Sequence, residues 1–114
     1  MSAATYNITI EQGATFSKTL TVKGPNDTPL DLTTLNEVRA QLRYRAQADE
    51  KWDFAVTILD TQNGTIKWSM LPSVTNTIER SKGVYDMELV WNDGRIERIL
   101  QGDVNIKSNI TREE

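Results

Sequence analysis

Residues 83–106 read GVYDMELVWNDGRIERILQGDVNI and contain two alternating runs on either side of a turn. One face of the first run carries four apolar side chains, Tyr85, Met87, Leu89 and Trp91. Asp86 and Glu88 stand on the opposite face. Alternation with a period of two is typical of a strand with one buried face, and Asp93-Gly94 favours a hairpin turn between two such strands. The stretch therefore predicts an antiparallel β-hairpin.

The register of this hairpin contains one conflict. A two-residue turn at Asp93-Gly94 sets Trp91 opposite Ile96. The same register places Arg98 opposite the apolar face that is expected to be buried. A bulge near Ile99 or an open sheet edge would each remove this conflict, and the pattern does not choose between them.

The same alternation recurs along most of the chain. Further strands are predicted in residues 6–11, 16–22, 37–45, 54–58 and 66–70. Asn63-Gly64 separates the last two runs and predicts another hairpin. About eight short strands with turns every eight to twelve residues are typical of a β-sandwich or a small barrel. We therefore expect an all-β fold of one of these two kinds.

The remaining segments complete the expected organisation. Residues 73–82 favour one short helix, because Ser73 can cap it and Gly83 can end it. With 114 residues the chain has room for a single domain, which we place at residues 5–111. Flexible tails are expected at residues 1–4 and 112–114.

The composition narrows the chemistry. The chain contains no histidine and no cysteine, which excludes imidazole bases, thiol nucleophiles and thiolate metal sites within it. Its net charge of −3 argues against a general nucleic-acid binder. No apolar run is long enough for a membrane helix, and no signal peptide is evident at the N-terminus.

The search for a catalytic site finds no candidate. Asp86 and Glu88 form the most interesting carboxylate pair, but both lie on one face of one predicted strand, and no cleft separates them. No phosphate-binding glycine loop, nucleophile elbow or metal-ligand spacing is present. We therefore expect no catalytic residue, no cofactor and no metal, and predict that the protein is not an enzyme.

Four residues are the candidates for contact with a partner. Arg39, Arg43 and Arg45 form a basic row on one face of a predicted strand. They could bind an acidic partner, although a solvated face paired with Asp86 and Glu88 is the commoner arrangement. Trp52 lies in residues 46–53, a polar stretch that we expect to be a loop, and is the aromatic candidate for an interface.

The other conspicuous aromatic residues are expected to be structural. Trp68 and Trp91 are in phase with the buried faces of their strands, so we place both in the core. Tyr85 follows Gly83 where the chain enters a strand. A tyrosine at such a corner donates its hydroxyl to upstream backbone in immunoglobulin-like sandwiches, and we expect the same here.

Nearly the whole chain resembles small virion proteins of tailed phages. The resemblance is carried by YNITIEQGATFSKTLTV, PLDLTTLNEVRAQLR, FAVTILDTQNGTIKWSM and TNTIERSKGVYDMELVWNDGRIERILQGDVNIKSNITR. The layout is similar to the immunoglobulin-like N-terminal domain of phage baseplate upper proteins. The resemblance thus implies an all-β fold that is a single immunoglobulin-like antiparallel β-sandwich. Val84 departs from the pattern, since an extra aromatic residue is common at that position.

This resemblance implies a non-enzymatic virion component made in the host cytoplasm. It implies an adaptor of the tail, baseplate or fibre-attachment region that contacts other virion proteins and forms homo-oligomers in the particle. A head decoration protein and a monomeric carbohydrate- or peptide-binding module are the alternatives. No nucleic-acid or membrane partner is expected.

Overall fold

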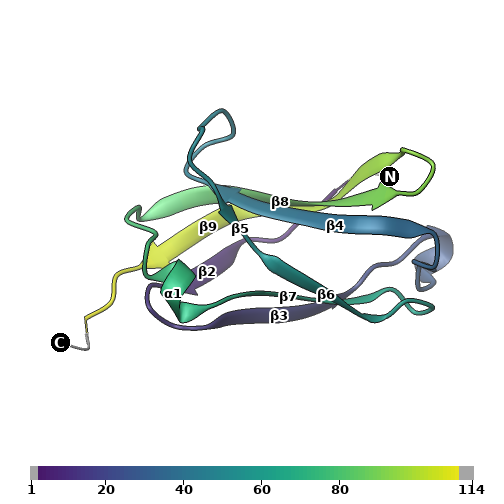
Figure 1. Cartoon of the computed structure of the whole chain (residues 1–114), viewed down its shortest axis with the longest axis horizontal. Helices are drawn as coiled ribbons and strands as arrows, with labels where there is room; N and C mark the ends of the chain where they lie inside the picture. Colours follow the sequence, from purple (N-terminus) through teal and green to yellow (C-terminus); the bar gives the residue numbers. More distant parts are fainter. Residues whose placement is uncertain (1–2, 111–114) are drawn as a thin grey trace.

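The protein is a two-layer β-sandwich, seen in a computed structural model that describes residues 3–110 (Figure 1). The larger sheet contains β1 (Ala4–Thr5), β2 (Ile8–Glu11), β9 (Ile96–Lys107), β8 (Lys82–Trp91), β4 (Leu35–Arg43) and β5 (Trp52–Asp53). The smaller sheet contains β3 (Phe16–Thr21), β7 (Thr65–Met70) and β6 (Ala55–Asp60). The all-β sandwich predicted from the sequence is confirmed.

Each sheet has its own strand order. The larger sheet runs β1-β9-β8-β4-β5 with β2 also on β9, and the smaller sheet runs β3-β7-β6. The pairing is antiparallel except at the N-terminus, where β1 and β2 pair parallel to β9.

The core lies between the two sheets and is strongly aromatic. Trp68 of β7 is 1% exposed and lies at its centre. Its ring contacts Phe16 at 5.2 Å, Phe54 at 5.1 Å and Tyr85 at 5.3 Å between ring centroids. Trp91 is also buried, so the placement of both tryptophans in the core is confirmed.

The β8–β9 hairpin resolves the conflict over Arg98. Its loop is three residues long rather than two, because Trp91 pairs with Arg95 and Gly94 takes the left-handed conformation at φ 92°. Val90, not Trp91, therefore stands opposite Ile96. The register shifts again near Ile99, as one of the two alternatives predicted. Arg98 then pairs with Glu88 on the outer face.

The predicted helix at residues 73–82 is wrong in extent. The helix α1 spans only Pro72–Thr75. Asn76 and Thr77 are weak helix formers, and the buried Thr75 hydroxyl is held by the backbone of Ala14 and Gly13. The chain must then extend, because Ser81 already accepts a hydrogen bond from β9.

Part of the tail expected at the N-terminus belongs to the larger sheet. Ala4 pairs with Leu100 in the larger sheet, so the sheet begins inside the tail expected at residues 1–4. Residues 1–2 and the tail expected at residues 112–114 lie outside the described residues. A short 3-10 helix, η1 (Pro25–Asp27), lies in the loop after β3.

Candidate functional site

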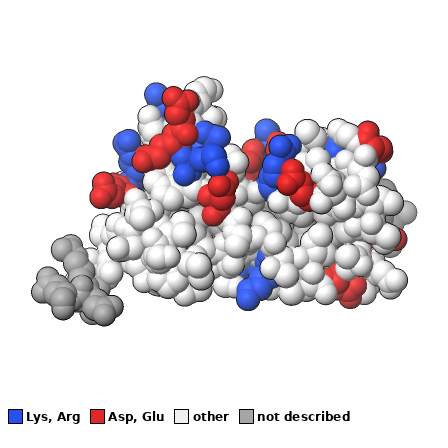
Figure 2. Space-filling model, viewed as in Figure 1, with Lys and Arg blue, Asp and Glu red and all other residues white. Residues whose placement is uncertain are grey.

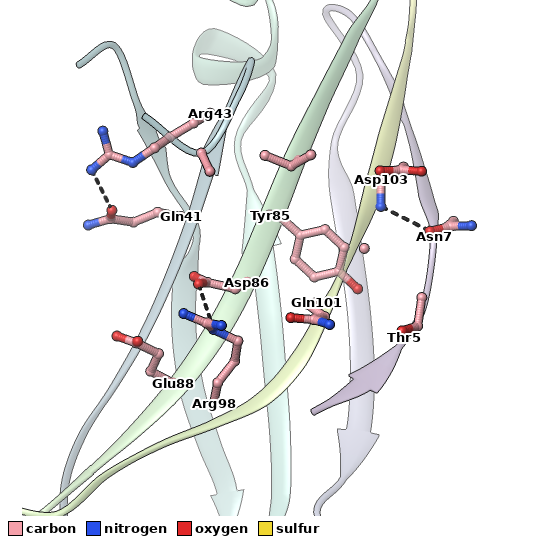
Figure 3. Close-up of a pocket in the computed structure, with 13 residues that line it drawn as sticks. Thr5, Asn7, Gln41, Arg43, Tyr85, Asp86, Glu88, Arg98, Gln101 and Asp103 are labelled. Atoms are coloured by element: carbon pink, nitrogen blue, oxygen red, sulfur yellow. Dashed lines mark hydrogen bonds and ion pairs between the residues drawn. The ribbon is translucent and has the colours of Figure 1, made fainter. Parts of the chain in front are cut away.

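A shallow hollow of about 620 Å³ opens in the outer face of the larger sheet (Figure 3). It runs across β4, β8 and β9 and reaches the N-terminal segment. We call it the outer-face hollow and define it by Gln41, Arg43, Asp86, Arg98, Gln101 and Asp103. Thr5, Asn7 and Glu88 also line it.

The strand register places these polar residues side by side. Arg39, Glu88 and Arg98 stand in one row across β4, β8 and β9, and Gln41, Asp86 and Gln101 stand in the next row. In each strand the intervening residues point into the sandwich, as Tyr85, Met87 and Leu89 do. The alternation that buries one set of side chains in the core therefore also places the polar set on the outer face.

Ion pairs connect the rows. Arg98 Nε lies 3.1 Å from Asp86 Oδ2, and Arg39 lies 3.7 Å from Glu88 Oε1. One interpretation of the sequence paired the arginine row with these two carboxylates. The structure shows such a pair between Arg39 and Glu88. Asp86 pairs instead with Arg98, the residue whose face the sequence pattern left undecided.

Arg43 joins the hollow to the neighbouring loop. Its guanidinium donates to Gln41 Oε1 at 3.1 Å and to the backbone carbonyl of Ala48. Ala48 belongs to residues 44–51, the loop between β4 and β5 that projects above the sheet (Figure 1). Charged side chains gather over this loop and the larger sheet, whereas the visible side of the smaller sheet is mostly uncharged (Figure 2).

The N-terminal segment closes the far side of the hollow. Asn7 Oδ1 accepts a hydrogen bond of 2.9 Å from the backbone amide of Asp103. The Tyr85 hydroxyl donates to the carbonyl of Tyr6. The structural role predicted for Tyr85 is confirmed, although its backbone partner lies on the N-terminal segment. Burial raises the pKa of Tyr85 far above its usual range, with a smaller contribution from Tyr6.

The four predicted contact residues are not brought together. Arg39 and Arg43 share the outer face, whereas Arg45 lies beyond the end of β4 and packs near the ring of Tyr44. Trp52 is not in a loop. It forms β5, pairs with Leu42, and is 9% exposed with its indole nitrogen 3.1 Å from Thr77 Oγ1. Trp52 therefore presents almost no surface to a partner.

Sequence reasoning missed the contribution of β9 and the N-terminal segment. Asn7 was not a candidate, because the parallel pairing of β2 with β9 joins residues from opposite ends of the chain. Gln101 and Asp103 were not candidates either, although the local β8–β9 hairpin places them opposite Asp86 and Val84. One local signal was available. Gly102 interrupts an alternating run, and a glycine inside a strand often marks a close approach of another backbone.

The hollow presents polar and charged side chains on an open surface. Its carboxylates face arginines across neighbouring strands, which is suited to holding a complementary polar or charged surface. Within residues 3–110 no group of three or more acidic side chains gathers in a way that could hold a metal ion. No helix in that same range is long and apolar enough to cross a membrane.

A scan against protein-family models finds no match, and a search of curated proteins finds no significant similarity.

Proposed function

We propose that this protein is a non-enzymatic structural component of a bacteriophage virion. In this role it is an adaptor of the tail, baseplate or fibre-attachment region, and it works through contacts with neighbouring virion subunits. The phage setting is supported by the resemblance of its sequence to small tailed-phage virion proteins. The contact role is supported by the outer face of the larger sheet.

The observation that carries the proposal is the paired charge on that outer face. Surface ion pairs such as Arg98–Asp86 and Arg39–Glu88 add only about 0–1 kcal/mol each to stability. Folding alone therefore gives little reason for such an ordered array. Arrays of this kind give specificity to a protein–protein contact, because a wrong partner meets like charges.

The test is to look for the protein in purified particles. Antibody labelling in electron microscopy should place it at the tail tip or the neck of the phage that encodes it. Label spread across the head would favour a decoration protein instead. Complete absence from particles, by both labelling and mass spectrometry, would overturn the virion proposal.

A second test addresses the outer face directly. Replacing Arg39 and Arg98 by alanine removes two charges beside Glu88 and should reduce incorporation into particles at least about tenfold. A control with Lys67→Ala and Lys107→Ala removes the same charge from exposed positions outside the hollow. Equal incorporation of both variants would contradict a contact role for this face.

A monomeric binding module for carbohydrates or peptides is the second candidate. It is favoured by the size of the hollow, since about 620 Å³ falls within the range of small-ligand sites. Glycan and peptide titrations followed by chemical-shift changes at Gln41, Asp86 and Gln101 would distinguish this module from an adaptor. Saturable binding by a protein that is absent from particles would favour the module.

A further inference from the structure

The two edge strands of the smaller sheet differ in how their free sides are protected. β3 forms one edge of this sheet and β6 the other, with β7 between them. Among residues 3–110, neither β3 nor β6 pairs with a strand on its outer side. A free edge presents unpaired backbone donors and acceptors, which proteins protect with inward-pointing charges, short strands or bulges.

β3 carries an inward-pointing charge. Lys18 stands between Phe16 and Leu20 on the inward side of this strand and is half-buried. Its ammonium lies 5.9 Å from the centroid of the Tyr6 ring. An apolar strand added beside β3 would bury this ammonium further without a partner carboxylate, so the β3 edge discourages pairing.

β6 lacks such a charge over most of its length. Its six residues read AVTILD, and the first five carry no charge and include no proline or glycine. Val56 and Ile58 point inward and are half-buried, whereas the residues on either side of them are exposed. A bulge between Ile58 and Asp60 interrupts the pairing with β7 only near the end of the strand. An uncharged run of this composition is suited to pairing with a further strand.

A second copy of β6 fits this edge. Residues that stand directly opposite each other in a sheet share a face, so a two-fold axis at Thr57 keeps inward residues opposite inward residues. This axis brings Val56 of one copy opposite Ile58 of the other. Ala55 then stands opposite Leu59 on the outward side, where a small side chain leaves room for a large one.

Charge does not oppose this contact. The nearest charges lie at its ends, where Asp53 is ion-paired with Lys51 at 2.8 Å and Asp60 accepts a hydrogen bond of 2.8 Å from Asn63 in its own turn. An axis at Val56 would instead draw Asp53 into the pairing. The visible side of the smaller sheet is mostly uncharged (Figure 2), so a charged partner would find few opposite charges there, whereas an identical strand brings none.

We propose that two copies pair through their β6 strands, antiparallel about a two-fold axis at Thr57, so that their three-stranded sheets join into one continuous sheet. The contact is isologous, because the same strand serves on both sides, and it therefore closes at the dimer. The inference rests on the proposed structural role and names one of its subunit contacts. The outer-face hollow belongs to the other sheet and stays free for other subunits.

Disulfide trapping tests the axis in a chain that has no cysteine of its own. Opposed residues of an antiparallel pair have Cα atoms about 4.5–5.5 Å apart, a separation that a disulfide can span. Thr57→Cys should therefore give a covalent dimer under mild oxidation, and no larger species. Thr19→Cys is the control, because Thr19 is equally exposed on the other edge, and it should give at least about tenfold less dimer.

Charged variants test the register without oxidation. Thr57 and Thr19 both pair with Lys67, one from each side, so an added lysine meets the same neighbour within the chain at either position. In light scattering over a range of concentrations, Thr57→Lys should raise the dissociation constant of the dimer at least about tenfold, because two added lysines meet at the axis. Thr19→Lys should leave this constant unchanged.

A mixing experiment identifies the residue at the axis. Thr57→Glu alone should weaken the dimer as Thr57→Lys does. A mixture of the two variants should restore a dimer that contains one copy of each, because position 57 of one copy then meets the opposite charge at position 57 of the other. A mixture that associates no better than either variant alone would refute this register.

The contact itself is refuted by equal dimer yields from Thr57→Cys and Thr19→Cys. It is also refuted by a wild-type chain that stays monomeric at high concentration and gives no trapped dimer through Thr57→Cys. If that chain is still found in particles, the proposed virion role survives without this contact.

Discussion

At the scale of single residues, Gly102 is the position with the least freedom. A Cβ atom added there would lie 2.2 Å from the carbonyl oxygen of Tyr6 and 2.7 Å from its carbonyl carbon. Tyr6 cannot move away, because its amide donates to the carbonyl of Gln101 and its carbonyl accepts from the Tyr85 hydroxyl. One glycine thus allows the N-terminal segment to approach β9.

Gly102→Ala should lower the free energy of unfolding by about 2 kcal/mol or more, because a backbone must shift to admit the methyl group. Urea denaturation measures this change. Gly24→Ala is the matched control. Its nearest contact would be the flexible Leu30 side chain at 3.4 Å, and its backbone is not in the left-handed region, so its effect should be small. Similar losses from both variants would contradict the close approach at Gly102.

Tyr85 gives the molecule a defined sensitivity to alkali. Burial raises its pKa in the folded state above the ordinary value of 10.0. The unfolded chain therefore releases this proton first as pH rises. The stabilisation is complete below pH 10.0 and is lost progressively above it.

Comparison of the wild type with Tyr85→Phe isolates this effect from the lysines. At about pH 7 the variant should be less stable by about 1–2 kcal/mol, since the Tyr6 carbonyl loses its donor. Above about pH 10 the wild type should lose stability more steeply than the variant. Parallel curves in urea titrations would show that the Tyr85 proton is not linked to folding.

At the scale of elements, β5 is very short but contributes a buried side chain to the core. It contains only Trp52 and Asp53, yet the Trp52 indole is buried and donates to Thr77. Residues 46–51 before it are mostly polar, but Phe54, Val56 and Ile58 after it continue in phase with Trp52. Extending the alternating run of residues 54–58 back by two positions places Trp52 on the buried face, so the loop predicted at residues 46–53 was wrong at its last two residues.

Trp52→Ala should lower the free energy of unfolding by about 3–5 kcal/mol, the usual cost of removing a large buried aromatic side chain. Leu59→Ala is the control, because Leu59 is 53% exposed at the end of β6 and should cost little. Thermal denaturation compares the two. A Trp52→Ala protein of unchanged stability would restore Trp52 as an exposed contact residue.

The elements that could be predicted from the sequence are those formed locally. The alternation in residues 83–91, together with the turn signals Asp93-Gly94 and Asn63-Gly64, predicted both hairpins, since each pairing joins neighbours in the chain. The helix was overextended because Ser73 and Gly83 can each mark a helix end, but two successive turns, closed by the amides of Thr77 and Ile78, replace the helix beyond Thr75.

At the scale of the whole molecule, the pairing of the first strands with the last could not be predicted. Ile8 pairs with Val104, and no local pattern connects residues so far apart. The candidate site depends on this pairing. Arg39 and Arg43 could be placed on one face from their own strand, but Asn7 joins that face only when the N-terminal segment lies against β9.

The parallel pairing of β1 and β2 with β9 also determines how the molecule would bear a mechanical load. β1 and β2 run in the same direction as β9, so their N-terminal end and the C-terminal end of β9 lie at opposite ends of the pair. Tension between the two ends of the chain is then directed along the strands. It loads the backbone hydrogen bonds of this ladder together, in shear.

Single-molecule stretching measures the difference. Handles attached near residues 4 and 107 should require a higher rupture force than handles attached at Ala4 and Glu97, where the strands separate one hydrogen bond at a time. Equal forces in the two geometries would show that this ladder is not the resisting element. When neighbouring subunits hold a chain at its two ends, their pull runs along β1, β2 and β9. The ladder between these strands is then loaded in shear, the direction in which it is strongest.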